Sequence, residues 1–278
     1  MSIEFKRILN NIGLKKLIKS NDLEVENIEN SFGTRVNAKI DLTNIGNEDI
    51  TKLKTLLMDK GMLVIPSHRI LNEEEQIKIT NFFGRANKNV SYISPHTIIN
   101  EQVVTNNNTY LSSALWHCDH PNLKNPPHIS VFQILDDVNS NWETAFISLH
   151  EVCSNISEEQ KKDWLGINVM YSGEDIVHPL LRVHPFTGKQ SLYFDFRFVK
   201  EVFNICEATG EIMLKNSNEI VFKLNELFSK HISVYNHKWC SGDIVIIDNY
   251  TISRREVSTP DTTKTSLARR STTEGIYF

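Results

Sequence analysis

Short stretches rich in β-branched and aromatic residues alternate with turn-rich loops from about residue 90 to the end of the sequence. ISVFQIL, SLYFDFRF and DIVIID are three such stretches, and the loops around them hold most of the proline and asparagine. Only two helical stretches are expected in this part, near residues 152–164 and 214–230. Strands with this spacing are typical of sandwiches and barrels. The sequence therefore predicts an α+β fold that is mainly β and carries helices on its outside.

The preceding part of the chain has helical periodicity. Residues 48–60 predict an amphipathic helix that ends at Gly61, and the short apolar stretch MLVIP after it predicts a buried strand. LNEEEQIKITNFFG predicts a second helix, with Asn72 as its N-cap and acidic residues in its first turn.

The first nineteen residues have the spacing of a basic amphipathic helix. Such a helix either packs on the domain or binds a membrane surface, and packing is the more common role. Because the sequence shows neither an internal repeat nor a low-complexity linker, we predict one domain over residues 32–278, preceded by a helical extension over residues 1–31.

Charge and cysteine content limit the possible partners. The 30 Lys and Arg residues against 34 Asp and Glu residues give a formal net charge of −4, so no broad basic field is available for nucleic acid. No apolar run is long enough for a transmembrane helix. The four cysteines are far apart and show no CxxC pairing. We therefore expect a cytoplasmic protein that takes a small-molecule partner and contacts neither nucleic acid nor membrane.

The densest group of functional side chains is WHCDH, which spans residues 116–120. In an extended stretch, His117 and Asp119 project from the same face, so an imidazole and a carboxylate can converge on one ion. Two histidines and a carboxylate form the usual protein site for non-haem Fe(II), because this ligand set leaves open positions for a co-substrate and dioxygen. His-x-Asp alone is weak evidence, since a hydrogen-bonded pair at a strand end has the same pattern.

Further motifs give this pair a context. In order along the chain, they are FGTRV at 32–36, IDL at 40–42, GMLVIP at 61–66, FFG at 82–84, WHCD at 116–119, ETAF at 143–146, HPLLRVHP at 178–185, TGK at 187–189, WCSGDIVIIDN at 239–249 and RSTTEG at 270–275. With these motifs, residues 32–278 resemble the taurine dioxygenase (TauD/TfdA) family of Fe(II)- and 2-oxoglutarate-dependent oxygenases. The resemblance implies a double-stranded β-helix, or jelly roll, with a metal site at its open end.

The same resemblance implies roles for individual residues. His117 and Asp119 match the first two iron ligands of the family, and Thr144 matches a threonine that contacts 2-oxoglutarate. Arg270 could face an anionic substrate. An active member would use Fe(II) and 2-oxoglutarate to hydroxylate or desaturate a small organic substrate, with an amino-acid-derived or anionic molecule as a candidate.

One departure concerns the metal. The family's second histidine ligand lies five positions after the Asn of the Asp-Asn pair, and counting from Asn249 this position is Arg254. A guanidinium has no lone pair to give to a metal. Its charge about 4 Å from a dication would cost on the order of 8 kcal/mol at an effective dielectric near 20. Arg254 should therefore point away from any bound iron, or pair with Asp119 in place of the ion.

A second departure concerns 2-oxoglutarate. The family's arginine for the distal carboxylate lies four residues before the arginine that Arg270 matches, and this position is Ser266. Arg269 or Lys264 could supply the missing charge, with looser geometry in the case of lysine. We take Arg269 as the expected 2-oxoglutarate contact.

These observations leave three hypotheses open. The leading one is an active non-haem iron, 2-oxoglutarate-dependent dioxygenase, an oxidoreductase, in which His117 and Asp119 bind the metal. The second is a non-catalytic member of the same fold that binds a small molecule or a partner in the old pocket. The third is a metal-independent enzyme that reuses the pocket's acid, base and anion-binding groups.

Overall fold

The structure is a computed structural model that describes residues 23–28, 32–37, 40–93, 102–105, 108–111, 114–135, 142–205, 209–231, 233–258 and 267–275. The helix predicted over residues 1–19 lies outside these residues, as does most of the predicted extension over residues 1–31. Within that extension, β1 (Val25–Asn27) pairs with β2 (Thr34–Val36).

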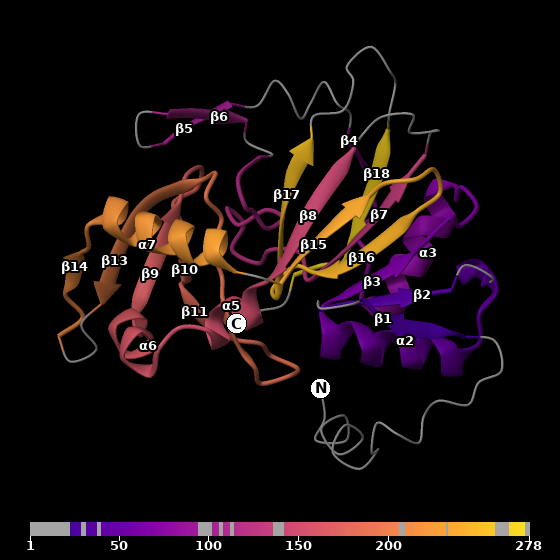
Figure 1. The fold of residues 1–278 in the computed structure, drawn as a ribbon, viewed down its shortest axis with the longest axis horizontal. Helices are drawn as coiled ribbons and strands as arrows, with labels where there is room; N and C mark the ends of the chain where they lie inside the picture. Colours follow the sequence, from indigo (N-terminus) through magenta and orange to yellow (C-terminus); the bar gives the residue numbers. More distant parts are fainter. Residues whose placement is uncertain are drawn as a thin grey trace.

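Two sheets form the jelly roll (Figure 1). The larger has the strand order β1-β2-β3-β16-β7-β18-β4, and the smaller has the order β15-β8-β17. The remaining strands of the larger sheet are β3 (Met62–Ile65), β4 (Ser91–Ile93), β7 (Ile129–Ile134), β16 (Ile244–Asp248) and β18 (Ala268–Thr272). Those of the smaller sheet are β8 (Glu143–Ser148), β15 (Val234–Lys238) and β17 (Ile252–Ser258).

Strand β16 shows why the sequence has a continuous apolar run at DIVIID. Ile244 and Ile246 point to one face and pack with the helices, whereas Val245 and Ile247 point to the other and join the core between the two sheets. A strand that is buried on both faces loses the alternation of polar and apolar residues.

Two helices cover the outer face of the larger sheet, after a 3-10 turn at Leu42–Asn44. They are α2 (Asn47–Lys60), which ends at Gly61 in a left-handed conformation with φ 77°, and α3 (Glu73–Phe83). Asn72 and Glu75 form a reciprocal capping box at the start of α3. Both predicted helices and the predicted strand between them are confirmed.

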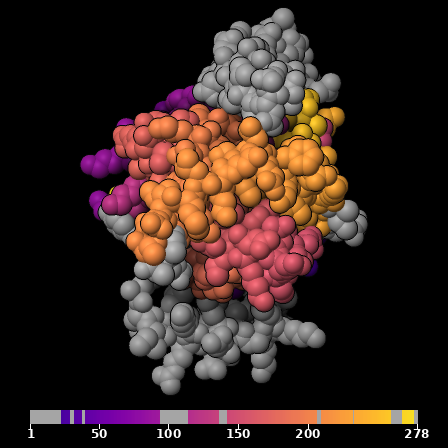
Figure 2. Space-filling view, turned by 90° about the vertical axis from the view of Figure 1, so that its left-hand side faces the viewer, coloured from indigo at the N-terminus to yellow at the C-terminus, as the bar shows by residue number. Residues whose placement is uncertain are grey.

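A further layer covers the outer side of the smaller sheet, and Figure 2 shows it from outside. It contains a four-stranded sheet, a two-stranded sheet and three helices. Its strands are β9 (Ile167–Tyr171), β10 (Ile176–Pro179), β11 (Leu181–Val183), β12 (Gln190–Leu192), β13 (Val199–Ile205) and β14 (Ile212–Leu214). Its helices are α5 (Leu149–Ser154), α6 (Glu158–Trp164) and α7 (Ser217–Lys230).

Two predictions in this layer need correction. The helix expected near residues 152–164 is two short helices, because Ser157 leaves the helical conformation to cap α6. The stretch SLYFDFRF is a strand only at its start, in β12, although Tyr193 and Phe194 are buried in the core. Burial, not strand pairing, accounts for its apolar pattern. The hairpin of β5 (Gln102–Thr105) and β6 (Asn108–Leu111) completes the described strands.

Candidate functional site

A cavity of about 340 Å³ opens between the two jelly-roll sheets. The strands β4, β7 and β18 supply one wall, and β8 and β17 supply the other. Its apolar lining is mainly aromatic and includes Phe132, Trp142, Phe146, Phe198 and Trp239. The sequence-predicted residues His117, Asp119, Thr144, Arg254 and Arg270 also line this cavity.

His117 and Arg254 lie directly opposite each other. Their backbones form an antiparallel bridge, with N···O distances of 2.9 Å and 3.0 Å in the two directions. The Asn249 side chain fixes the neighbouring Asp119 backbone, since its Oδ1 accepts from the Asp119 N–H at 2.6 Å and its Nδ2 donates to the Asp119 carbonyl at 2.9 Å. The three predicted positions therefore meet at one end of the cavity.

The Asp119 carboxylate is held by two guanidinium groups. Arg254 Nη2 lies 2.8 Å from Oδ1, Arg270 Nη1 lies 2.9 Å from the same oxygen, and the Ser130 hydroxyl donates to Oδ2 at 2.6 Å. Burial opposes ionisation, but the charges of Arg254 and Arg270 hold the pKa of Asp119 well below its usual range. Asp119 is therefore ionised, and its charge is more than balanced by the protein.

His117 is a neutral imidazole in a defined tautomer. Its Nδ1 lies 2.7 Å from the Leu115 carbonyl oxygen, which requires a proton on Nδ1 and leaves the lone pair on Nε2. Burial, together with the charges of Arg197 and Arg254, holds the pKa of His117 well below its usual range. This tautomer is the one that a histidine needs to bind a metal through Nε2.

Thr144 lies at another part of the cavity, in a chain of hydrogen bonds that leads to Glu256. The Trp239 indole N–H donates to Thr144 Oγ1 at 2.8 Å, and Thr144 Oγ1 donates to Glu256 Oε2 at 3.0 Å. The Trp142 indole N–H donates to the same oxygen at 2.7 Å. Burial raises the pKa of Glu256 to about 7, although both hydrogen bonds and Arg254 oppose the shift.

Glu256 is not among the site residues predicted from the sequence. The available signal was its spacing, because residues two apart on a strand share a face, and Glu256 follows Arg254 by two. Arg197 is not among the predicted site residues either. It lines the cavity, where it pairs with Asp195 at 2.8 Å and donates to the Cys118 carbonyl.

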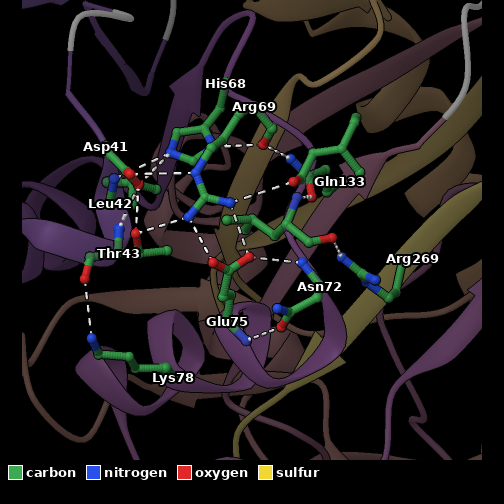
Figure 3. A network of polar contacts seen from close by, with 12 residues as sticks. Asp41, Leu42, Thr43, His68, Arg69, Asn72, Glu75, Lys78, Gln133 and Arg269 are labelled. Carbon is green, nitrogen blue, oxygen red and sulfur yellow. Dashed lines mark hydrogen bonds and ion pairs between the residues drawn. The ribbon is translucent and has the colours of Figure 1, made fainter.

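Arg269 does not lie in the cavity, which contradicts its predicted role as a 2-oxoglutarate contact. Its guanidinium points to the helix side of the larger sheet, where Nε donates to Gln76 Oε1 at 2.6 Å and Nη2 donates to the Leu71 carbonyl at 2.6 Å. Figure 3 shows Arg269 there, beside the polar network around Arg69. The reason is strand alternation: Ala268 and Arg270 face the cavity, so Arg269 faces away. Lys264 and Ser266 lie outside the described residues.

Arg270 faces the cavity, as expected for a residue that meets an anionic substrate. Besides Asp119, its guanidinium contacts the Ser91 hydroxyl at 3.1 Å and His120 Nε2 at 3.1 Å. These contacts keep its charge at the same end of the cavity as Arg254.

A second buried cluster brings together His128, His184 and Asp248, whose possible ligand atoms all lie within 4.8 Å of one another. Asp248 Oδ2 is 2.8 Å from His184 Nε2 and 3.5 Å from His128 Nε2. His184 Nδ1 accepts from two backbone N–H groups, so the proton of the neutral ring is on Nε2, where a metal would need a lone pair. Within the described residues, His128 Nε2, His184 Nε2 and Asp248 Oδ2 make no hydrogen bond, so the carboxylate and the two rings are in electrostatic contact only.

Comparison with known proteins identifies the family. Residues 24–253 match the taurine catabolism dioxygenase TauD, TfdA family. The chain belongs to this family. The match covers most of the chain.

Individual relatives are distant. An alpha-ketoglutarate-dependent sulfonate dioxygenase of Saccharomyces cerevisiae is 22% identical, over 84% of this chain and 63% of its own length. The 3-((Z)-2-isocyanoethenyl)-1H-indole synthase of Fischerella ambigua is also 22% identical, over 80% of this chain and 85% of its own. The chain thus spans less than two thirds of the yeast protein.

The fold is shared with solved structures. The crystal structure of a taurine dioxygenase from Burkholderia xenovorans matches with a TM-score of 0.75 and 18% identity, covering 92% of both chains. The predicted family and jelly-roll fold are confirmed. The comparisons also support the predicted class of function, an oxygenase-like protein for a small organic molecule, in a family of oxidoreductases that use Fe(II) and 2-oxoglutarate. Among the described residues, no helix has the length and apolarity to span a membrane.

The residues of this cavity do not fit the family's iron centre. Two cationic groups contact Asp119 Oδ1, and one of them is Arg254, at the position where the resemblance predicts the third ligand. The described residues also do not fit a 2-oxoglutarate contact at Thr144, because that hydroxyl already donates to Glu256. The fold of the family is retained, while Asp119 and Thr144, which the resemblance predicts to contact the metal and the co-substrate, are engaged within the protein.

Proposed function

We propose that this oxygenase-like protein binds a small organic anion in the cavity between its jelly-roll sheets, and that Arg254 stands in place of the catalytic metal ion. The observation that carries the proposal is the 2.8 Å contact between Arg254 Nη2 and Asp119 Oδ1, reinforced by Arg270 on the same oxygen. A fixed cation there relieves the cost of burying Asp119 without an ion.

Charge supports an anionic ligand. Arg254 and Arg270 bring two positive charges to Asp119, so this end of the cavity has one positive charge in excess. Arg197 adds none, because Asp195 balances it. The aromatic walls suit an organic body attached to the anionic group. The sulfonate named for the yeast relative is one such anion. As part of the same proposal we place the protein in the cytoplasm, supported by the free thiols of Cys118, Cys153 and Cys240.

A second candidate is an iron-dependent oxygenase, and one observation favours it. His117 keeps the tautomer of a metal ligand, with its Nε2 lone pair available. In this case, His117 and Asp119 would hold the Fe(II) after Arg254 had left the carboxylate, and the metal would supply the oxidative chemistry of the family.

One titration separates the two candidates. Fe(II) and 2-oxoglutarate are added anaerobically to metal-free protein, and the visible charge-transfer band of the chelated complex is recorded. We expect no band for the wild type. Arg254→His, which supplies a third ligand, should bind Fe(II) alone in anaerobic calorimetry, and the double variant His117→Ala, Arg254→His should lose this binding. A wild-type band that His117→Ala abolishes would overturn the proposal in favour of the oxygenase.

Ligand binding itself is tested in the presence of a chelator. Calorimetry with a panel of small sulfonates and carboxylates should give binding to the wild type that weakens at least about tenfold in Arg270→Gln, a change of about 1.4 kcal/mol. A panel that binds only when Fe(II) is added would contradict a metal-free site.

A further inference from the structure

We infer that Glu256 is a built-in carboxylate that fills the Thr144 end of the cavity and closes this end to carboxylate ligands, 2-oxoglutarate included. The inference concerns the cavity of the proposed function, but it requires neither a metal nor a ligand at Arg254. It assigns a specificity-determining role to a residue that the sequence motifs do not include.

The placement of Glu256 follows from strand register. On the antiparallel pair of β17 and β8, Glu256 lies directly opposite Thr144, and Arg254 lies opposite Phe146. Side chains at such paired positions project to the same face and meet. A single strand thus brings a cation to Asp119 and, two residues later, an anion to Thr144.

The donors at this end have no free proton for a ligand. The indole N–H of Trp142 and the hydroxyl of Thr144 both donate to Glu256 Oε2, and each has only one proton to give. The indole N–H of Trp239 is used on Thr144 Oγ1, which orients that hydroxyl toward Glu256. Trp142, Thr144 and Trp239 are all buried, with exposed fractions of 3%, 2% and 5%.

These donors form a site for a carboxylate oxygen whatever its source. Two N–H or O–H groups converge on one oxygen among buried aromatic side chains, where hydrogen bonds to an anion are strong. If Glu256 were absent, the same donors would be buried without acceptors, which is costly. A carboxylate ligand can therefore reach these donors only by displacing Glu256, and above about pH 7 the two negative charges repel each other.

Glu256 is a costly way to satisfy these donors. Burial raises its pKa to about 7, so the protein gives up part of the stability that a neutral amide would provide at the same place. If this position only had to accept two hydrogen bonds, the amide oxygen of a glutamine could accept them in place of Glu256 Oε2. The carboxylate adds a charge, and that charge excludes a second anion.

The test is rescue by carboxylates in metal-free protein with a chelator present. Wild type, Glu256→Ala and Glu256→Gln are titrated with acetate, succinate and 2-oxoglutarate, and both melting temperature and calorimetric affinity are recorded. We expect Glu256→Ala to bind these carboxylates at least about tenfold more tightly than the wild type does. Glu256→Gln, which keeps an acceptor in place, should gain much less.

Thr144→Val added to Glu256→Ala removes one donor, and it should abolish most of the gain. A gain that survives this second substitution would overturn the inference, because binding would then lie elsewhere. A folded Glu256→Ala protein without any gain would overturn it too.

If Glu256→Ala does not fold, the wild type still provides a test. Trp142 and Trp239 lie beside Glu256 and Thr144, so their fluorescence should not change when 2-oxoglutarate is added in the absence of metal. A saturable change that Thr144→Val removes would overturn the inference. These outcomes are separate from those of the proposed function, since they depend on variants of Glu256 and Thr144, whereas the proposed function is tested with variants of Arg254 and Arg270.

Discussion

Arg254 places Nη2 2.8 Å from Asp119 Oδ1, and its backbone is bridged to His117 through two hydrogen bonds. Arg254 thus lies at the position where the family resemblance predicts a metal ligand, and its guanidinium has no lone pair to give to a metal. Because Arg270 contacts the same oxygen, the carboxylate has two positive partners and is buried to 1% exposure. A structure of this kind holds Asp119 in place without an ion.

Arg254→Met should destabilise the protein by about 3 kcal/mol at neutral pH, because breaking a buried ion pair leaves a charge partly uncompensated. Arg254 and Arg270 lower the pKa of Asp119 despite its burial, so this stabilisation is present above the usual pKa of aspartate and is lost as the pH falls. The difference between wild type and variant in urea unfolding should thus shrink at acidic pH.

The matched control for this variant is Arg255→Met, on the exposed face of the same strand. It should cost less than about 1 kcal/mol, from the loss of its contact with the Trp116 ring. Equal losses for the two variants would show that the Arg254 pair contributes nothing specific.

Arg269→Met should lower the free energy of unfolding by about 2 to 4 kcal/mol, because two hydrogen bonds from a buried charged group are lost and the buried Gln76 Oε1 is left without a donor. Ligand binding in the cavity should stay unchanged, since the guanidinium lies on the helix side of the sheet. Urea unfolding and the anion titration are measured on the same preparations. A selective loss of binding without a loss of stability would return Arg269 to the role that the sequence predicted.

The helices α2 and α3 and the strands β3, β7 and β16 could be predicted because each is encoded locally. Asn72 and Glu75, which form the capping box of α3, mark its start within four residues, and the apolar run of β16 reflects burial on both faces. The convergence of His117, Asp119 and Arg254 could also be predicted. The family motifs align Asn249, and counting five residues from it gives Arg254.

The errors arose where a long-range register decides the outcome. Arg269 and Arg270 are neighbours of the same type, and only the pairing of β18 with β7 determines which of them faces the cavity. Glu256 gains its role from lying opposite Thr144, more than a hundred residues earlier in the chain. His184 and Asp248 meet in the same way. No local pattern carries such a pairing, so these contacts required the structure.

Asp248→Asn should destabilise the protein by about 3 kcal/mol, because His128 and His184 would lose the charge that both of them face. Burial opposes ionisation of Asp248, but the two histidines lower its pKa, so its contribution is present above the usual range and lost toward acid pH. Urea unfolding measures the effect. Asp175→Asn, which removes an exposed pair with Lys200, should cost less than about 1 kcal/mol.

The same cluster gives a result for metal removal. Because His184 Nδ1 accepts from two backbone N–H groups, the neutral ring has its proton on Nε2 and no lone pair there for a metal, so we expect a chelator to leave the melting temperature of the wild type unchanged. A drop that is absent in Asp248→Asn would show that the three residues hold a metal after all.

Glu256→Gln should change how stability depends on pH. Burial raises the pKa of Glu256 from 4.5 to about 7, so the folded protein holds a proton there that the unfolded chain releases at lower pH. Its destabilising effect is absent below about pH 4.5, grows as the pH rises and is complete above pH 7, where it reaches about 3 kcal/mol, since one pKa unit corresponds to about 1.4 kcal/mol. Glutamine keeps the acceptor for Trp142 and Thr144 but does not titrate. In urea unfolding, the variant should therefore match the stability of the wild type near pH 4.5 and exceed it increasingly toward pH 8.

In Thr144→Val, which removes a hydrogen bond that favours the ionised form of Glu256, the pH dependence of stability seen for the wild type should move to higher pH. A constant difference between wild type and Glu256→Gln from pH 4.5 to 8 would mean that Glu256 titrates as an ordinary exposed carboxylate. In that case its charge beside Thr144 would be solvated by water and not buried.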